Sequence, residues 1–471
     1  MSIRSFRFFI LPLVLVSMHP PTLDARTFTD TQNRTLEAEV VSVQERSITI
    51  RRSDGRRFTI PISQLSDEDQ AYIEEYKRQK RAAEPSALEG PDVKQLNDSF
   101  GVPLFGETVL WEESAKAIAK RLNWPRESQT ESLSSYRLYP DDSYTILKSR
   151  PYSAVLYGEN DKATSLSMVF ANKGDLPTRN PEIIEDAVEL DGETIENQLV
   201  NLLGKPDRMN LGRYDMKERV SRWDWRDHAI LLSQQDGEYV SLRIMPPDIA
   251  DNRGFNDRIT KAEMRERLLE HVVRYPNGDV LIQGIPMVDQ GPKGYCVPAT
   301  FERYLRFLSI PADMYVLAMA GQTGIGGGTD IRKIVENAQS YVSYSGRDLE
   351  EERMEANIKD VSDFIEEGVP IMWTLLSGRD FNEIANKRTR EREKQKDWEA
   401  WKERCEKENE VVRATIPRDR EAAHMCMIVG YNEGTGELAI SDSWGKFFEL
   451  RWITVGQAEQ VSLGNFYIID L

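Results

Sequence analysis

Apolar and polar residues alternate along the first part of the chain in a way that is typical of short β-strands. The alternation occupies two stretches within residues 26–80, and an Asp54-Gly55 pair after the second indicates a hairpin turn. The Ser66 to Asp69 spacing then predicts the start of a helix, because these side chains can cap the free N–H groups of its first turn. The alternating apolar residues are Leu36, Ala38 and Val40 in the first stretch and Ile48 and Ile50 in the second.

Residues 100–250 repeat one pattern twice. A helix expected over residues 106–125 precedes two strand-like stretches, and a helix expected over residues 192–206 precedes two more; a glycine opens each helix and a proline stops it. Two such units side by side predict a duplicated α+β domain with one continuous antiparallel sheet. A polar, charged linker over residues 81–99 precedes it. We assign no chemistry to this domain and interpret His228 as a structural histidine.

From about residue 280 the pattern changes, and a cysteine stands just ahead of an amphipathic helix. Apolar residues follow Cys296 at helical spacing, and Pro298 fits because it falls in the first turn. The free N–H groups and the dipole at a helix N-terminus stabilise a thiolate and lower the pKa of a cysteine, as a nucleophile requires. A cysteine that only packs in the core is the alternative interpretation.

Polar residues elsewhere in this region favour the nucleophile. Gln290 precedes Cys296 across the glycine-bearing turn "QGPKGYC", which can bring its amide N–H beside the backbone N–H of the cysteine as an oxyanion hole. His424 heads an apolar strand and Asp442 ends the next, so pairing of these strands would place imidazole and carboxylate side by side. The other three histidines precede the cysteine in the chain and lack such surroundings. The set predicts a nucleophile, a general base and a group that orients the base.

A glycine-rich loop, "GQTGIGGGTD", lies ahead of a predicted helix in the same region. The backbone groups of Gly326, Gly327 and Gly328 are exposed enough in such a loop to pair with an extended peptide. A plain helix-initiating turn explains the glycines equally well. The loop lacks the lysine and the hydroxyl residue of a phosphate-binding loop.

A charged insertion, residues 382–413, precedes His424. Trp398, Trp401 and Cys405 lie on one face of it, and the pattern predicts a solvated helix docked by a narrow stripe, in preference to a regulatory lid.

The net charge argues against some classes of partner, and the N-terminal residues indicate the compartment. With 61 basic and 78 acidic side chains the formal net charge is −17, which argues against nucleic acid or an anionic membrane as the main partner. Residues 1–25 carry two arginines, an apolar run and a proline pair, the pattern of a secretory signal peptide, so we expect export to the periplasm or the cell exterior. A retained N-terminal anchor is the alternative, and no later stretch approaches the length of a membrane span.

Three cysteines are too few for a disulfide scaffold, and an odd number leaves at least one thiol free. A bond between Cys405 and Cys426 would leave Cys296 as that thiol.

Taken together, the three separated motifs of the C-terminal region resemble the papain-like cysteine peptidase superfamily over residues 280–471. The resemblance implies a papain-like α+β domain in which Cys296 is the nucleophile, His424 the general base and then acid, Asp442 the orienting residue and Gln290 the oxyanion donor. It also implies that Gly326, Gly327, Gly328 and Trp444 line the substrate cleft, with Trp444 shielding the His–Asp pair from water. The matching residues are Gln290, Gly291, Gly294 and Cys296 in the "QGxxGxC" turn, His424, Val429, Gly430 and Tyr431 in the "HxxxxVGY" strand, and Trp444 and Gly445 in "DSWG".

The sequence departs from papain relatives at two positions. Val297 stands where they usually have an aromatic residue, and Asp442 replaces their asparagine. The aspartate is more similar to bacteriocin-processing, double-glycine peptidases and their exported relatives, although transglutaminases also use Cys-His-Asp sets.

The N-terminal segment, residues 26–80, resembles the Sla homology domain, a small β-barrel whose bacterial relatives commonly follow an export signal. The frame "RTFTD…LSDEDQ" carries the likeness, with Phe28 in place of the usual tryptophan. The resemblance implies a module that binds a peptide or protein ligand, and a purely structural barrel is the alternative.

These inferences combine in one hypothesis: an α+β, exported thiol hydrolase that cleaves peptide bonds in a peptide or protein substrate and requires no metal or organic cofactor. A catalytically silent scaffold built on a peptidase fold, and a transglutaminase-like acyl transferase, are the alternatives.

Overall fold

The computed structural model describes residues 26–43, 47–52, 57–66, 68–73, 76, 90–256, 259–325 and 327–471. The predicted signal peptide and residues 81–89 of the predicted linker lie outside the described residues. The chain divides into two compact units, Met1–Glu89 and Gly90–Leu471, which are described separately. Helices and antiparallel strands occupy separate segments, so the predicted α+β class is confirmed. In the described part of the chain, no helix has the length and apolar character needed to span a bilayer.

The first unit is a four-stranded antiparallel sheet in the order β1-β2-β3-β4. The expectation of a closed barrel is wrong for the described residues, where β1 and β4 remain unpaired edges and a single bridge joins Asp30 to Leu65. The buried Asp69 carboxylate accepts hydrogen bonds from Arg26 at 2.7 Å and from the Thr29 N–H at 2.7 Å, so a side chain links β1 to the predicted helix start in place of a strand ladder. The strands are β1 (Arg26–Thr29), β2 (Thr35–Val43), β3 (Ser47–Arg52) and β4 (Arg57–Pro61), followed by the turn η1 (Ile62–Gln64).

An eight-stranded antiparallel sheet, here called the central sheet, begins the second unit. Its order, β5-β6-β7-β8-β12-β11-β10-β9, places two four-stranded halves next to each other with β8 and β12 at their junction. This is the continuous sheet that the repeated pattern predicts. The strands are β5 (Arg126–Gln129), β6 (Leu133–Leu138), β7 (Ser153–Glu159), β8 (Lys162–Asn172), β9 (Asp207–Leu211), β10 (Glu218–Trp225), β11 (His228–Gln235) and β12 (Tyr239–Met245).

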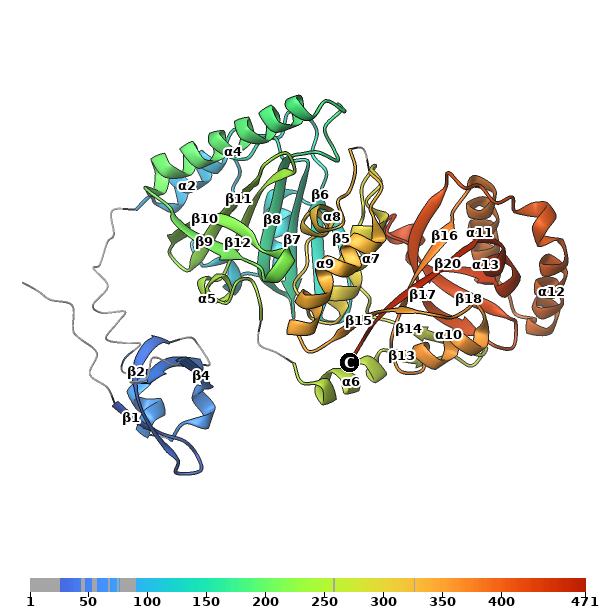
Figure 1. Ribbon diagram of the computed structural model, residues 1–471, viewed down its shortest axis with the longest axis horizontal. Coiled ribbons are helices and arrows are strands. Elements are labelled where there is room, and N and C mark those ends of the chain that lie inside the picture. Colours follow the sequence, from blue (N-terminus) through green and yellow to red (C-terminus); the bar gives the residue numbers. More distant parts are fainter. Residues whose placement is uncertain are drawn as a thin grey trace, which may run out of the picture. The chain divides into compact units, whose positions relative to one another are not determined.

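Helices α2 and α4 cover one face of the central sheet (Figure 1). The predicted helix starts are wrong, since α3 begins after a Ser114 cap and α4 after an Asn180 cap. Gly192 lies inside α4, where a Cβ would stand 2.2 Å from the Gln234 side chain, so this glycine permits close packing and does not open the helix. The elements are α2 (Val93–Phe100), η2 (Leu110–Glu112), α3 (Ala115–Leu122), α4 (Pro181–Leu203), η3 (Tyr214–Met216) and α5 (Pro247–Asp251).

A second sheet follows in the order β13-β14-β17-β16-β20-β15, and β18 pairs with both β17 and β19. Helices α7 to α9 lie between the two sheets (Figure 1). The part of the chain that contains the central sheet and its helices is here called the central domain. One hydrophobic cluster includes residues of α7 to α9 together with Val169, Met216 and Tyr239 of the central domain, so the two sheets share a core. The strands are β13 (Val272–Arg274), β14 (Asp279–Ile282), β15 (Asp348–Glu352), β16 (Ile371–Leu376), β17 (Ala423–Asn432), β18 (Glu437–Ser441), β19 (Arg451–Thr454) and β20 (Ser462–Asp470).

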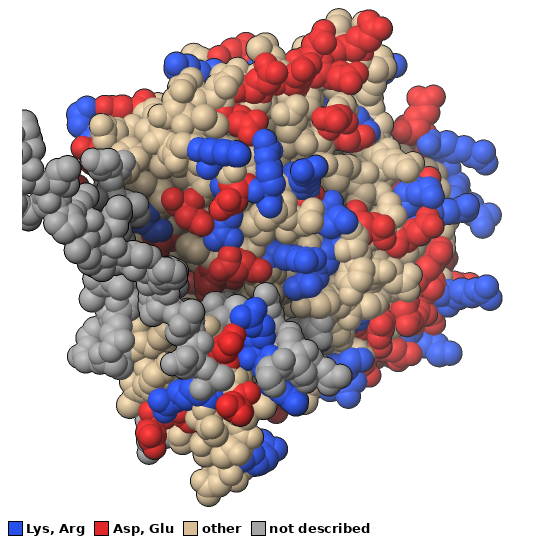
Figure 2. Space-filling view, turned by 60° about the vertical axis from the view of Figure 1, so that its left-hand side comes forward, with Lys and Arg blue, Asp and Glu red and all other residues tan. Residues whose placement is uncertain are grey.

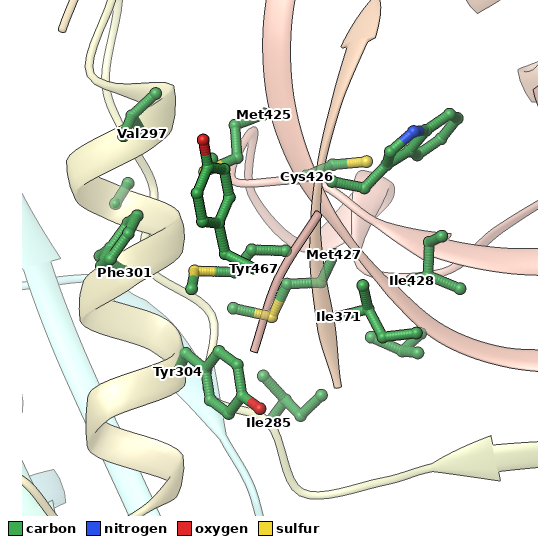
Figure 3. Close-up of a cluster of buried hydrophobic side chains, with 14 of the residues drawn as sticks. Ile285, Val297, Phe301, Tyr304, Ile371, Met425, Cys426, Met427, Ile428 and Tyr467 are labelled. Carbon is green, nitrogen blue, oxygen red and sulfur yellow. The ribbon is translucent and has the colours of Figure 1, made fainter. Parts of the chain in front are cut away.

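Apolar side chains fix α7 against the second sheet. Figure 3 shows Phe301 and Tyr304 of α7 in one cluster of buried side chains with Met425 and Met427 of β17. Val297, at the position where papain relatives have an aromatic residue, is buried in the same cluster. The helices are α6 (Lys261–Glu270), α7 (Cys296–Phe307), α8 (Met314–Ala320), α9 (Ile331–Tyr344), α10 (Ile358–Ile365) and α13 (Val455–Val461), with the turn η4 (Lys446–Phe448).

The charged insertion forms two helices, α11 (Arg379–Arg392) and α12 (Trp398–Thr415). Trp401 and Cys405 are buried, and the Trp401 indole N–H donates to Glu437 at 3.1 Å. Buried Arg388 and Arg392 also pair with Glu437. A buried ion-pair cluster therefore holds the insertion in addition to the predicted apolar stripe.

Figure 2 shows acidic and basic side chains interspersed over the face that it views, with acidic groups gathered along the upper edge.

Candidate active site

Cys296 is the first residue of α7, as the pattern predicted. Pro298 is the third helical residue, a position whose N–H has no partner within the helix. The backbone N–H groups of Val297 and Met425 point at the sulfur and stabilise its ionised form. All three cysteines are free thiols, but Cys405 and Cys426 are buried, whereas Cys296 is partly exposed. Cys296 is therefore the thiol that a substrate can reach.

His424, near the start of β17, is hydrogen-bonded to Cys296. Burial works against ionisation of the thiol, yet the hydrogen bond and the charge of His424 bring the pKa of Cys296 below its ordinary value. Burial likewise works against protonation of the imidazole, yet the bonds to Asp442 and Cys296 raise the pKa of His424 to about 9. The two shifts favour a thiolate beside an imidazolium at neutral pH.

Asp442 fixes the orientation of the imidazole. Its Oδ1 lies 2.8 Å from His424 Nε2, which leaves Nδ1 as the ring nitrogen for Cys296. The side chains of His424 and Asp442 are 6% and 0% exposed. The Trp444 ring stacks on the imidazole with 4.4 Å between ring centroids. The indole therefore lies over the face of the imidazole.

Two hydrogen bonds hold the side-chain amide of Gln290 in one orientation. Its Nε2 donates to the Lys293 carbonyl at 2.9 Å, and its Oε1 accepts from Ser443 Oγ at 2.8 Å. Because a carbonyl can only accept, the amide nitrogen must face Lys293. The described residues supply no acceptor for the second N–H of this amide, so that N–H is available to a ligand.

The glycine-rich segment lies against the turn that precedes Cys296. Gly294 and Gly327 form a parallel bridge, and the Gly328 N–H donates to the Gly294 carbonyl at 3.3 Å. A Cβ on Gly327 would stand 2.6 Å from Gly294 Cα, so the close approach requires glycine. Gly326 lies outside the described residues.

Two parts of the chain match known families. Residues 282–461 match the Peptidase_C39 like family. Residues 17–81 match the SLA1 homology domain 1. Both matches confirm the resemblances drawn from the motifs. No curated protein matches the chain.

In the Peptidase_C39-like domain, two buried arginines that the sequence analysis missed surround Asp442. Arg451 donates to Asp442 Oδ2 through Nε at 2.9 Å and through Nη2. Burial opposes ionisation of Asp442, but the Arg451 charge and the His424 bond hold the pKa of this carboxyl below its ordinary value. A lone arginine at the head of the apolar strand "RWIT" was the available signal.

The second arginine, Arg303, connects three parts of the Peptidase_C39-like domain. From α7 it donates to the Pro286 carbonyl at 3.0 Å and to the Asp442 carbonyl at 2.9 Å. Burial lowers the pKa of Arg303 to about 10, so it remains charged at neutral pH. The signal was an arginine amid the apolar residues of "FERYLRF".

His228 and His271 lie apart from this site. His228 is buried in the central domain, where its Nε2 accepts the Leu110 N–H at 3.1 Å and burial lowers its pKa to about 4. A neutral imidazole that caps a backbone group fits the structural interpretation of His228. Burial also lowers the pKa of His271, which packs on Phe307.

Proposed function

We propose that the Peptidase_C39-like domain hydrolyses peptide bonds through Cys296, His424 and Asp442. The proposal rests above all on the continuous series of contacts from a partly exposed thiol, through His424, to a buried carboxylate under Trp444. The family match supports the cysteine peptidase class, which implies a peptide or protein substrate.

The proposed reaction begins with attack of the Cys296 thiolate on the carbonyl carbon of the scissile amide. The resulting oxyanion accepts hydrogen bonds from the second N–H of Gln290 and from the backbone N–H of Cys296. His424 Nδ1–H then protonates the leaving amine, the C–N bond breaks, and a thioester remains.

Hydrolysis of the thioester completes the cycle. Water gives a proton to His424 as its oxygen attacks the thioester carbonyl, and the C–S bond breaks to release the acid. The products are an amine and a carboxylic acid, and the thiolate–imidazolium pair is restored.

The proposal extends to the compartment and to the N-terminal unit. We propose that the leader directs export and is cleaved after Ala25, and that the SLA1 homology domain binds a peptide or protein. N-terminal sequencing of protein recovered outside the cytoplasm tests the first part. Recovery of a chain that still begins with the leader, within the cytoplasm, would contradict it.

Thiol labelling tests the proposed catalysis. Iodoacetamide should modify Cys296 rapidly at neutral pH in the wild type and slowly in His424→Ala, while Cys405 and Cys426 remain unmodified. A peptide library should be hydrolysed by the wild type and not by Cys296→Ala.

Other outcomes of these assays identify the alternatives. Slow labelling together with no hydrolysis would favour a silent scaffold. Incorporation of a primary amine into the acyl product, in place of hydrolysis, would favour a transglutaminase-like acyl transfer.

A further inference from the structure

Side chains of the central sheet hold the segment that carries Gln290. Residues 286–290 form neither strand nor helix, although Arg303 donates to the Pro286 carbonyl and the Gln290 N–H donates to the Ser443 carbonyl at 2.9 Å. The Met287 N–H donates to Ser128 Oγ at 2.9 Å, and the Asp289 N–H donates to Glu127 Oε1 at 2.8 Å. Tyr139 donates its hydroxyl to the Asp289 carbonyl at 2.5 Å. All three contacts reach across from β5 and from the residue after β6.

These anchoring side chains are themselves held. Glu127 pairs with Arg137 at 2.6 Å, and both side chains are 3% exposed. Arg137 in turn lies 3.7 Å from Glu302, a buried residue of α7. A network of charges therefore links the anchors to the helix that begins with Cys296.

The Tyr139 ring also fits closely over the turn after Gln290. Gly291 has a φ of +71°, and a Cβ there would lie 3.0 Å from the ring of Tyr139. The absence of a side chain at residue 291 allows the backbone to approach the Tyr139 ring closely.

The segment is attached at its other end as well. Tyr295, immediately before the nucleophile, is buried and donates its hydroxyl to Asn172 at 2.9 Å at the end of β8. Gly174 leaves the room for it, since a Cβ there would lie 1.7 Å from the Tyr295 oxygen. The segment from 286 to 296 is thus fastened to the central sheet on both sides of Gln290.

We infer that the central domain is a working part of the active site, in which Glu127, Ser128 and Tyr139 are positioning residues for the oxyanion donor Gln290. The inference rests on the proposed function and gives the duplicated domain a role that its sequence did not indicate. Removal of this domain would take away the contacts of Met287, Asp289 and Tyr295 and leave the segment held only from the C-terminal side, through Pro286 and Gln290.

Acyl chemistry and alkylation depend differently on this arrangement. Stabilisation of an oxyanion requires a donor fixed near the position that the charge will occupy. Alkylation by iodoacetamide forms no oxyanion and depends on the thiolate of Cys296 and its partner His424. Loosening the segment should therefore reduce kcat for peptide hydrolysis and leave the alkylation rate unchanged.

The decisive variant is Tyr139→Phe in the full mature chain. Loss of one such hydrogen bond should lower kcat about fivefold. KM and the alkylation rate of Cys296 should stay at wild-type values, and Tm should fall by no more than about 4 °C. Tyr144→Phe is the matched control, because the Tyr144 hydroxyl contacts the Trp124 indole at 3.1 Å within the central domain and does not touch the segment.

A double-mutant cycle tests whether Tyr139 affects kcat through Gln290. In a Gln290→Ala background the donor is already lost, so Tyr139→Phe should lower kcat no further. Equal losses in both backgrounds, or an equal loss in Tyr144→Phe, would overturn the inference.

A wild-type kcat in Tyr139→Phe, or a parallel fall in the alkylation rate, would overturn it as well. A wild-type chain that neither hydrolyses peptides nor reacts rapidly with iodoacetamide would overturn the proposed function and this inference together.

Discussion

Single residues around Asp442 decide the protonation of the candidate site. The carboxylate is fully buried, and it serves both His424 and Arg451 through different oxygens. The arginine keeps the carboxylate ionised, and the ionised carboxylate in turn favours the imidazolium. The charge on His424 then favours the Cys296 thiolate, so a change at one of these residues should alter the titration of the others.

Asp442→Asn tests this coupling through the pH profile. In the wild type, kcat/KM should rise as Cys296 ionises and fall as His424 loses its proton near its pKa of about 9. The asparagine still accepts the Nε2–H but removes the negative charge, so the pKa of His424 should fall. We expect the alkaline limb of kcat/KM to move to lower pH. An unchanged alkaline limb would show that the carboxylate charge does not raise the pKa of His424.

Arg451→Met tests the stability side of the same contact. The variant leaves Asp442 buried without its cation, which should lower the free energy of unfolding by about 3–5 kcal/mol. Urea unfolding at neutral pH measures the loss. Arg451→Met combined with Asp442→Asn should recover much of it, because a neutral side chain needs no counter-charge. An equal loss in the single and the double variant would contradict the ion-pair explanation.

Whole elements were predicted from sequence where local patterns decide them. The start of α7 at Cys296 and the apolar strand behind His424 follow from spacing and strand pattern alone. The start of α4 did not, because Gly192 has a packing role against β11 that only the tertiary structure reveals. The contacts of Arg303 with Asp442 and of Tyr139 with Asp289 were missed for the same reason, because each joins residues more than one hundred positions apart in the chain.

The approach of the glycine-rich segment to the Cys296 turn yields a prediction with an internal control. Gly327 and Gly328 both have positive φ, +107° and +87°, so alanine strains the backbone at either position. Only at Gly327 does the added Cβ also meet Gly294, at 2.6 Å from its Cα, whereas nothing lies within 4 Å at Gly328.

Gly327→Ala should therefore displace the turn and slow iodoacetamide labelling of Cys296 several-fold. Gly328→Ala should keep the wild-type labelling rate. Backbone strain at its positive φ should lower the free energy of unfolding, measured in urea, by about 1–3 kcal/mol. Identical labelling rates in the two variants would show that the approach to Gly294 does not position Cys296.

At the scale of the whole molecule, each hydrophobic cluster of the described residues lies within one of the two units. The cluster of the first unit contains only residues between Phe28 and Tyr76, and the other clusters contain only residues after Gly90. The larger unit, in contrast, joins the central sheet and the Peptidase_C39-like domain through a shared core and through the partly buried hydrogen bond from Tyr157 to Glu302 at 2.9 Å.

Two truncations should therefore behave in opposite ways. A chain that begins at residue 90 retains the whole core of the larger unit. Its Tm should match that of the larger unit in the mature protein, and Cys296 should be labelled at the same rate in both. A chain that begins at residue 259 loses the central sheet, exposes apolar residues of α7 to α9 and leaves Glu302 without Tyr157 and Arg137. We expect the shorter chain to lack a cooperative unfolding transition in calorimetry and to lose rapid labelling of Cys296. Cooperative unfolding with rapid labelling in that chain would instead mark the Peptidase_C39-like domain as an independent folding unit, since the shared core would then not be required for either property.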